Sequence, residues 1–386
     1  MKRIIGLIIV LMVITSNSIV YGAESSQEIK KIKVYFETKE ATLKNPVISV
    51  NDSVLMSYDD LFPNLGILND KNHIIWNSKG KSLTIIYGKQ KILYKIDFNI
   101  ANVSNKKFNL DAKPIIYKNK PYIPITSVES VFSKKVCYDN YLNRLYIRDM
   151  IEFKKIKDIL VKSIDASQKI RNGSSVYEYK DKKVQIKDVY TFDCITHILH
   201  RKGTITDEAV NDFESYYIND LTYERYTVHK GNSEPTYEWH MKKATDEDIN
   251  VYNLYTVFSN RFNIQDSTIA GATFKVVGNE IIISGKSLLY FKDSEYDNKK
   301  QEIPNTSFEI HIGKTDNLIK KYNYSCQSIL LYNPEAPTKF DNGMSQYYTS
   351  VNSSENVSMP DFSREVVVDD TNIIPIDDDT NIRITY

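Results

Sequence analysis

The sequence feature that most constrains the fold is a pattern that occurs twice, at residues 45–56 and 113–124. Each stretch reads Pro, two β-branched residues, two other residues, Asn, two more residues and an apolar pair. Asn suits a tight turn because it tolerates positive φ and its side chain hydrogen-bonds to its own backbone. The flanking β-branched and apolar residues are typical of short strands. The sequence therefore predicts two β-hairpins of the same design.

The similarity between the two stretches continues after each hairpin. A short segment with helical apolar spacing follows, and a second hairpin is predicted next, with turns at 78–81 and 140–143. A single hairpin is only marginally stable in water, so each helix is expected to cover the strands of its own unit. We therefore predict an N-terminal, β-rich domain at 30–149, built from two repeats at about 45–87 and 113–149.

This domain resembles the copper amine oxidase N-terminal-like domain, a stalk-type module common on secreted bacterial proteins. The residues that carry the resemblance are Pro46, Val47, Ile48, Asn51, Val54, Leu55, Leu65 and Gly66 in the first repeat and Pro114, Ile115, Ile116, Asn119, Tyr122, Ile123, Pro124, Tyr138 and Asp139 in the second. Residues 91–114, which link the repeats, fit the same pattern, whereas Met56 stands where the family has Pro. The resemblance implies a stalk or docking role.

The resemblance does not extend to a catalytic site. A copper amine oxidase needs a separate catalytic domain, with a quinone derived from tyrosine and a copper ion bound by three His. The chain has six His and no His-x-His pair. His197 and His200 lie in a predicted strand, where an odd spacing places them on opposite faces; on a helix they would share a face and could bind a metal. Because common catalytic motifs are also missing from the sequence, we expect no catalytic residue, no cofactor and no metal site.

The first 23 residues predict a secretory signal peptide. Lys2 and Arg3 form a positive start, an apolar run follows, and Gly22 or Ala23 offers a cleavage site. The apolar run is shorter than the roughly 20 residues that span a membrane. We therefore expect a secreted protein of the cell envelope, with no membrane span in the mature chain. An uncleaved N-terminal anchor is the alternative.

The net charge limits the kinds of partner that the chain can attract, and the number of cysteines limits the disulfides that it can form. Without Lys2 and Arg3, the 50 basic residues fall to 48 against 49 acidic ones, so no positive field would attract nucleic acid. The richness in Lys, Ile and Asn indicates AT-rich coding, as in Gram-positive bacteria of low GC content. Cys194 and Cys326 could form one disulfide if they share a domain, and three buried thiols are the alternative.

A second domain begins at residue 151. Residues 151–173 predict one long amphipathic helix, which Asn172 and Gly173 end. A second helix is predicted at 244–263, where Thr245 can cap it and acidic residues in the first turn suit the helix dipole.

Strands fill the rest of this domain. They are predicted at 175–180, 184–201, 215–229, 236–243, 272–278, 280–291, 307–313, 318–332 and 346–360. Short turns between successive strands imply an antiparallel sheet, and a sheet of this size usually curls. The expected fold class is α+β, with the N-terminal repeat domain followed at 151–362 by a curved half-barrel sheet that packs on two α-helices.

This order of elements resembles the lipoprotein-carrier half-barrel superfamily, which includes the bacterial periplasmic lipoprotein chaperone and mycobacterial lipid-binding lipoproteins. The closing residues 346–360 resemble its last strand, which runs into an Asn and a Pro. In that superfamily the space between sheet and helices can hold acyl chains. The resemblance therefore implies a lipid or another apolar ligand.

The two helices supply the residues that would line such a space. They are Phe153, Ile156, Leu160 and Ile164 on the first helix and Tyr255, Phe258 and Phe262 on the second. The alternative is that they fill a closed core, because protein interiors normally contain few voids. A further set could form an exposed face for a carbohydrate or a protein, although strand packing explains it as well. Its members are Tyr216, Tyr217, Tyr223 and Tyr226.

The last residues, 363–386, carry five Asp in two short runs. They could bind calcium, but without EF-hand spacing a solvated tail is expected. We therefore predict a non-enzymatic envelope protein with a stalk or docking module and a domain that binds an apolar ligand or lipid. A structural module that binds a cell-wall or surface protein and no small ligand is the second possibility. A secreted hydrolase is the third.

Overall fold

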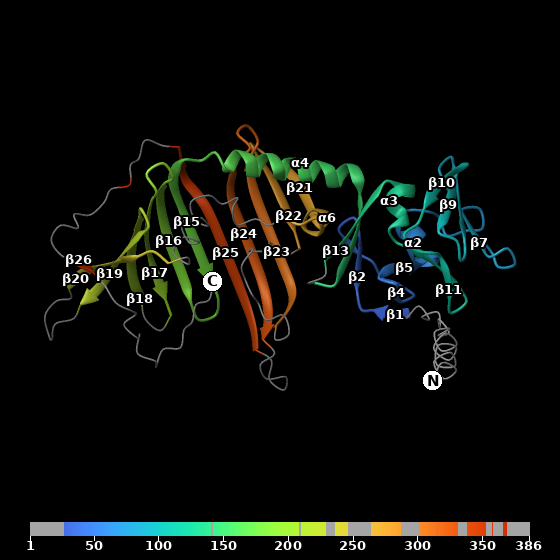
Figure 1. Ribbon diagram of the computed structural model, residues 1–386, viewed down its shortest axis with the longest axis horizontal. Helices are drawn as coiled ribbons and strands as arrows, with labels where there is room; N and C mark the ends of the chain where they lie inside the picture. Colours follow the sequence, from blue (N-terminus) through green and yellow to red (C-terminus); the bar gives the residue numbers. More distant parts are fainter. Residues whose placement is uncertain are drawn as a thin grey trace, which may run out of the picture. The chain divides into compact units, whose positions relative to one another are not determined.

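The computed structural model divides into two compact units (Figure 1). Unit 1 comprises residues 1–36 and 40–136, and unit 2 comprises residues 37–39 and 137–386. The residues that the structure describes are 27–139, 142–207, 210–228, 236–245, 264–286, 301–330, 338–352, 357 and 366–368. The predicted signal peptide, nearly all of the predicted second helix and most of the tail lie outside these ranges.

In its described part, unit 1 contains two five-stranded antiparallel sheets and two short helices. The first sheet has the strand order β1 (Gln27–Lys30), β4 (Val47–Val50), β5 (Ser53–Ser57), β12 (Lys120–Pro124) and β11 (Ile115–Tyr117). The second has the order β10 (Lys106–Asn109), β9 (Ile100–Val103), β8 (Gln90–Lys95), β7 (Ser82–Tyr87) and β6 (Ile74–Asn77). The helices are α2 (Tyr58–Asn64) and α3 (Ser127–Phe132).

Both predicted hairpins are present in unit 1. β4 and β5 pair across a turn in which Asn51 and Asp52 have φ of 48° and 63°. β11 and β12 pair across a turn in which Lys118 and Asn119 have φ of 46° and 64°. Two successive positive φ values match the twist of the flanking strands, which is why Asn is favoured there. The two turns have the same geometry even though Met56 replaces the expected Pro.

The core of unit 1 forms on both faces of its first sheet. One face holds Ile48, Leu55 and Tyr122, which are 0–2 % exposed. The opposite face holds Met56 and Ile123, which pair across β5 and β12 and are also buried. Because α2 packs on β5 and β12, the short helix helps to exclude water from these strands.

Unit 2 is dominated by one large sheet. Within the described residues it has 12 strands, which are antiparallel to their neighbours except where β26 runs parallel to β20. Their order is β21 (Ala272–Val277), β22 (Glu280–Gly285), β23 (Gln301–Gly313), β24 (Ile319–Leu330), β25 (Thr338–Val351), β15 (Asn172–Lys180), β16 (Gln185–Asp193), β17 (Ile198–Thr206), β18 (Val210–Ile218), β19 (Leu221–Val228), β20 (Thr236–Lys243) and β26 (Val366–Val368). The helices described in unit 2 are α4 (Met150–Ser167) and α6 (Asp266–Ala270). Four further strands fall near the unit boundaries in the sequence: β2 (Lys33–Phe36), β3 (Lys39–Glu40), β13 (Lys134–Asp139) and β14 (Arg144–Asp149).

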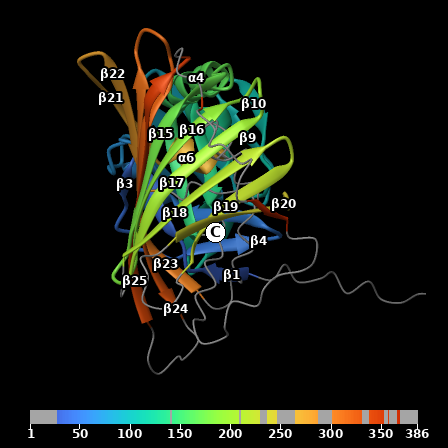
Figure 2. The ribbon, with the colours of Figure 1, turned by 90° about the vertical axis from the view of Figure 1, so that its left-hand side faces the viewer.

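The large sheet curls into an open half-barrel. Its strand directions turn progressively from β25 to β20 (Figure 2), because each strand is twisted relative to its neighbour. The two halves of the sheet, which are far apart in the sequence, join where β15 pairs with β25. The curled antiparallel sheet agrees with the half-barrel that the succession of strands predicts.

The predicted end of the long helix is wrong. α4 ends at Ser167, and Asn172 and Gly173 begin β15 instead of stopping the helix. Gly173 is needed for the close approach of two strands, since a Cβ atom there would lie 2.4 Å from the carbonyl oxygen of Ser350 on β25. The Asn-Gly pair therefore belongs to the sheet.

Two predicted strands are in fact hairpins. Residues 184–201 are divided into β16 and β17 by a turn in which the Asp193 carboxylate accepts hydrogen bonds from two backbone N–H groups. His197 lies in this turn with φ of 54°, so it does not share a strand with His200 as predicted. The strand predicted at 215–229 is likewise divided, into β18 and β19. The turn between them contains Asn219 and Asp220, which both have positive φ.

Strands account for most of the structured residues in the described part of the chain, and helices are few. The predicted α+β class is therefore not confirmed. Residues 366–368, which belong to the tail expected to be solvated, form β26 on the edge strand β20.

Candidate functional site

The candidate site is the face of the large sheet on which α4 packs. Strand pairing aligns nine residues on this face, since directly paired residues project to the same side. This central row consists of Phe274, Ile283, Ile310, Tyr322, Gln346, Tyr177, Asp188, Gly203 and Phe213. α4 lies on the same face, because the ammonium group of Lys155 is 4.6 Å from the centroid of the Phe274 ring.

The predicted lining residues of the first helix lie on α4, which begins where the Asp149 carboxylate accepts hydrogen bonds from two backbone N–H groups. Phe153, Ile156 and Leu160 are 0–4 % exposed, and Ile164 is partly exposed. The other three predicted residues lie outside the described part of the chain: Tyr255, Phe258 and Phe262.

Two serines complete the buried stripe of α4. Ser163 and Ser167 are fully buried. The Ser163 hydroxyl donates to the carbonyl oxygen of Ile159 at 2.7 Å, and the Ser167 hydroxyl accepts from the backbone N–H of Ile319 on β24 at 3.1 Å. Hydrophobic periodicity does not single out serines, although both positions continue the helical spacing of the apolar residues. Their small side chains let the helix approach β24 closely.

The chemistry of the central row changes along the sheet. Ile283 and Ile310, near the α4 end, are fully buried and apolar, whereas Gln346 and Asp188 are fully buried and polar. The Gln346 amide nitrogen lies 3.5 Å from the hydroxyl of Ser175, which is also fully buried. The covered face is therefore apolar at one end and polar in the middle.

The buried carboxylate of Asp188 is held by an arginine and a tyrosine. Its Oδ2 accepts from Arg201 Nε at 3.0 Å and from the Tyr190 hydroxyl at 2.8 Å, and Arg201 Nη2 lies 2.9 Å away. The Arg201 guanidinium also lies 4.4 Å from the ring centroid of Phe213. Gly203 leaves room for the carboxylate, because a Cβ atom there would lie 2.4 Å from Asp188 Oδ1. The positive charge of Arg201 and the hydrogen bonds to Asp188 offset the free-energy cost of burying this carboxylate.

Apolar and aromatic side chains surround these polar groups on the same face. Tyr190, Phe192 and Leu199 are buried in one hydrophobic cluster, with Met344 and Tyr348 packed against it. Residues from both halves of the sheet therefore contribute to one apolar surface. Sequence periodicity could not reveal this, because the pairing of β15 with β25 is not local.

The four tyrosines considered as a binding face do not share a face. Tyr216 pairs with Tyr223 on one side of the β18–β19 hairpin, whereas Tyr217 and Tyr226 project to the other. Tyr216 is 4 % exposed and stacks on His200, with ring centroids 4.2 Å apart. Burial raises the pKa of Tyr216 to about 12.

His200 belongs to a polar group on the same side as Tyr216. Its Nε2 is 2.9 Å from Glu214 Oε1, and Arg225 Nη1 is 2.8 Å from Glu214 Oε2. Burial lowers the pKa of His200, and the contact with Glu214 opposes this only in part. These contacts stabilise the β17–β19 region and do not resemble a metal site. Among the described residues, no group of three His, Cys, Asp or Glu side chains could hold a metal ion.

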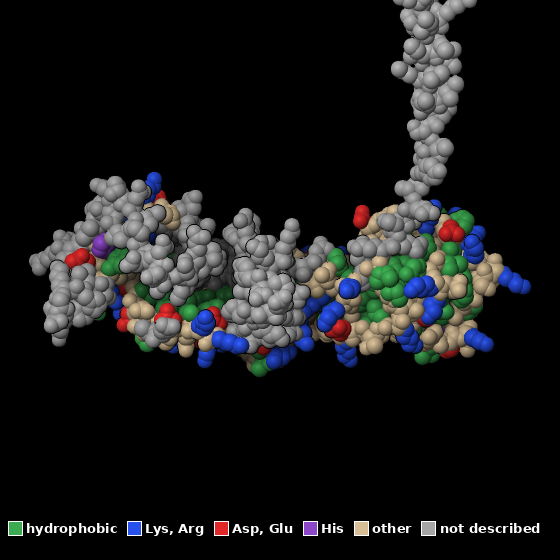
Figure 3. Space-filling model, turned by 90° about the horizontal axis from the view of Figure 1, so that it is seen from below, with side chains coloured by type: hydrophobic (Ala, Val, Ile, Leu, Met, Phe, Trp, Pro, Cys, Tyr) green, Lys and Arg blue, Asp and Glu red, His purple; other side chains and the backbone are tan. Residues whose placement is uncertain are grey.

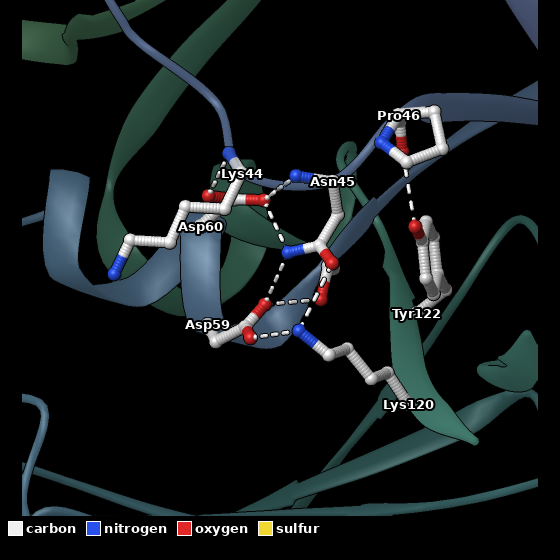
Figure 4. Close-up of polar contacts among 8 residues, drawn as sticks. Lys44, Asn45, Pro46, Asp59, Asp60, Lys120 and Tyr122 are labelled. Carbon is white, nitrogen blue, oxygen red and sulfur yellow. Dashed lines mark hydrogen bonds and ion pairs between the residues drawn. The ribbon is translucent and has the colours of Figure 1, made fainter. Parts of the chain in front are cut away.

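Unit 1 contains a separate polar cluster, which we call the clasp: Asn45, Asp59, Asp60 and Lys120 (Figure 4). The Asp60 carboxylate accepts from the backbone N–H groups of Lys44 and Asn45 at 2.9 Å each. The Asn45 amide donates to Asp60 at 2.7 Å and to Asp59 at 2.8 Å. Lys120 Nζ donates to Asp59 at 2.7 Å and to Asn45 Oδ1 at 3.0 Å. The clasp thus joins the segment before β4, the first turn of α2 and β12.

Within the clasp, the pKa of Asp59 is lowered and that of Lys120 is raised, as expected for an ion pair that stabilises the fold. Burial alone would raise the pKa of Asp59, but hydrogen bonds from Lys120 and Ser57 outweigh it and hold the pKa below its ordinary value. The hydrogen bond to Asp59 raises the pKa of Lys120. Both groups therefore stay charged near neutral pH, and neither has the properties of a general acid or base.

The surface of unit 1 carries apolar side chains as well. On the face seen in Figure 3 they gather in a group with Lys and Arg side chains around it. Ile29 and Leu68 are more than half exposed. Exposed apolar side chains are ordinary on folded proteins, so these residues alone assign no partner.

The remaining predictions concern membranes and cysteines. No helix in the described part of the chain is long and apolar enough to cross a membrane. Cys137 is buried and Cys194 is partly exposed. The side chain of Cys326 lies outside the described residues, so its pairing with Cys194 stays a prediction.

Comparison with known proteins identifies the N-terminal region. Residues 31–147 match the family model of the copper amine oxidase N-terminal domain, which confirms the resemblance found in the repeated pattern. No curated protein matches the sequence of the chain. Among solved structures, the crystal structure of LprF from Mycobacterium bovis is similar over 54% of this chain and 97% of that one, with 8% identity and a TM-score of 0.30. A likeness at that level assigns neither a ligand nor a function, so what the comparisons establish is that residues 31–147 are similar to the copper amine oxidase N-terminal domain.

Proposed function

We propose that unit 2 binds an apolar ligand or lipid on the face of the half-barrel that carries the central row. Unit 1 would act as a stalk or docking module, built from two repeats, on a secreted and non-enzymatic protein of the cell envelope. The observation that carries the proposal is the hydrophobic cluster that β15, β16, β17 and β25 form beside the polar groups on this face of the curled sheet, which we call the inner face.

The position of this surface supports a binding role. α4 packs on β21 and β24, whereas the hydrophobic cluster lies farther along the sheet, mainly on β25, β15, β16 and β17. An open sheet that curls around one apolar face can hold an acyl chain without strand rearrangement. The signal-like N-terminal sequence supports the envelope location, and the family match supports the stalk role.

A structural or protein-interaction module with a solid core is the second candidate. The observation that favours it is the burial of Phe153, Ile156 and Leu160, which are 0–4 % exposed and so already packed. In that case the inner face would hold no small ligand, and its side chains would serve stability alone.

Native mass spectrometry of the full chain, followed by lipid extraction, separates the two candidates. The binding proposal predicts a bound apolar species that disappears after delipidation. A single mass equal to that of the bare chain, together with no uptake of added methyl oleate, would favour the solid core.

Two neighbouring tyrosines on β25 provide a matched pair of variants. Tyr348 packs on the inner hydrophobic cluster, whereas Tyr347 projects to the other face, where Lys321 lies 5.7 Å from its ring centroid. Tyr348→Lys places a charge on the proposed binding face and should abolish ligand retention. Tyr347→Lys should keep the ligand. Equal retention by the two variants would contradict a ligand on the inner face.

A further inference from the structure

The centre of the central row contains a buried polar atom that has no hydrogen-bond partner among the described residues. Gln346 is fully buried, and in the described part of the chain its side-chain oxygen Oε1 has no hydrogen-bond partner. Its amide nitrogen has one contact, at 3.5 Å, with the Ser175 hydroxyl. A buried amide oxygen without a hydrogen-bond partner destabilises a folded protein, so such atoms are rare.

The surroundings of Gln346 combine apolar rings with hydrogen-bonding groups. Strand pairing places Tyr322 on one side of Gln346 and Tyr177 on the other, and both tyrosines are buried. Asp188 follows Tyr177 in the row, roughly 10 Å from Gln346 across two strands. A molecule on this face would therefore contact ring surfaces and meet one unsatisfied amide at their centre.

The chemistry of the amide indicates which ligand group fits. Gln346 presents an oxygen acceptor, and rotation of the amide by a half-turn would present N–H donors instead. A hydroxyl group can donate and accept, so it satisfies either orientation. A carboxylate fits less well, because burying its charge near Asp188 carries a large desolvation penalty.

We infer that Gln346 is the polar recognition residue of the half-barrel and that its ligand is a neutral, hydroxyl-bearing amphiphile. This inference depends on the proposed binding function and narrows its ligand class. The ligand hydroxyl bonds to the Gln346 amide, and the hydrocarbon lies along the apolar part of the inner face. Because Gln346 is fully buried, a ligand reaches its amide only if neighbouring side chains move.

The test compares three probes with the same hydrocarbon chain on the delipidated full chain. Glycerol monooleate carries hydroxyl groups, methyl oleate carries acceptors only, and oleate carries a charge. The wild-type chain should bind glycerol monooleate about tenfold more tightly than methyl oleate, as expected for one additional buried hydrogen bond. Oleate should bind more weakly than glycerol monooleate. Equal affinity for glycerol monooleate and methyl oleate would overturn the inference but leave the proposed function standing.

Substitution of Gln346 isolates its contribution. Gln346→Leu should lower the affinity for glycerol monooleate to that for methyl oleate, with methyl oleate binding unchanged. Gln346→Met, which has nearly the same length, serves if the first variant folds poorly. Both variants remove an unsatisfied amide, so the ligand-free melting temperature should stay the same or rise. A preference for glycerol monooleate that survives in both variants would overturn the inference, since the amide would then bind water or nothing.

Thr222 provides the matched control. It is 5 % exposed, and Thr222 Oγ1 also lacks a hydrogen-bond partner in the described part of the chain. It lies on β19, five strands from β25 in the sheet order. Thr222→Val should keep the tenfold preference. The same loss in Thr222→Val would show a general effect of core polarity and contradict a specific role for Gln346. Failure of the wild-type chain to bind any of the three probes would reject the proposed function and the inference together.

Discussion

At the scale of single residues, the clasp explains how distant parts of unit 1 are held together. Asn45 contacts both aspartates of the α2 first turn and the Lys120 side chain of β12. Asp60 is 3 % exposed and accepts hydrogen bonds from the two backbone N–H groups before β4. Residues that are 75 positions apart in the chain therefore meet at one amide group.

Asn45→Ala should destabilise unit 1 by about 1–3 kcal/mol, because it leaves buried carboxylate oxygens with fewer donors. The measurement is urea unfolding followed by the fluorescence of Trp76, in a Trp239→Phe background so that only unit 1 reports. Lys107→Met, at an exposed position on β10, is the control and should change the unfolding free energy little. Equal unfolding midpoints for Asn45→Ala and Lys107→Met would argue against the clasp.

The clasp should also respond to acid. The pKa of Asp59 is lower in the folded chain than its ordinary value of 3.8, so its charged form stabilises unit 1. This contribution is present above pH 3.8 and is lost as the pH falls through the lower pKa of the folded state. The difference in unfolding free energy between the wild type and Asp59→Asn should therefore be constant from pH 7 to about 5 and shrink below 3.8. A difference that grows on acidification would contradict the assigned direction.

At the scale of elements, α4 shows how a helix is fitted to a sheet. Its buried stripe ends in two serines, and the Ser167 hydroxyl accepts a hydrogen bond from the backbone of β24. A larger side chain at this position would push the helix away from the sheet and leave the Ile319 N–H group without its partner.

Ser167→Leu should therefore destabilise unit 2 by about 2–4 kcal/mol, the combined effect of overpacking and a lost buried hydrogen bond. Lys162→Leu adds the same side chain at an exposed position of the same helix and should have little effect. Urea unfolding followed by Trp239 fluorescence, in a Trp76→Phe background, measures both. A tolerated Ser167→Leu would mean that α4 does not pack closely on β24.

Local sequence signals predict the elements of this fold with uneven success. The turns at Asn51 and Asn119 follow from the chemistry of Asn, and the same signal occurs at Asn219-Asp220, inside the single strand predicted at 215–229. The turn after Asp193 depends on a side-chain hydrogen bond to the backbone, which apolar alternation does not show. The apolar alternation of residues 184–201 therefore predicts one strand, whereas the structure has the β16–β17 hairpin there.

At the scale of the whole molecule, short sequence patterns predict only part of the candidate site. The apolar stripe of α4 predicts Phe153, Ile156 and Leu160 as inward-facing residues, and the structure buries them. Gln346 and Asp188 lie in one row, separated by Tyr177, only because β15 pairs with β25, a strand far from it in the sequence. No short-range pattern encodes that pairing, because register between distant strands depends on the complete sheet.

The most direct test of the central claim is photolabelling of the full chain with an oleoyl analogue that carries a diazirine in its hydrocarbon chain. After irradiation and digestion, mass spectrometry locates the labelled residues. A ligand on the inner face of the half-barrel predicts labels on α4, β15, β16 and β25, at residues such as Tyr190, Met344 and Tyr348, and competition by glycerol monooleate. Labels confined to unit 1 or to the Tyr216 and Tyr347 side of the sheet, or no saturable labelling, would contradict the account.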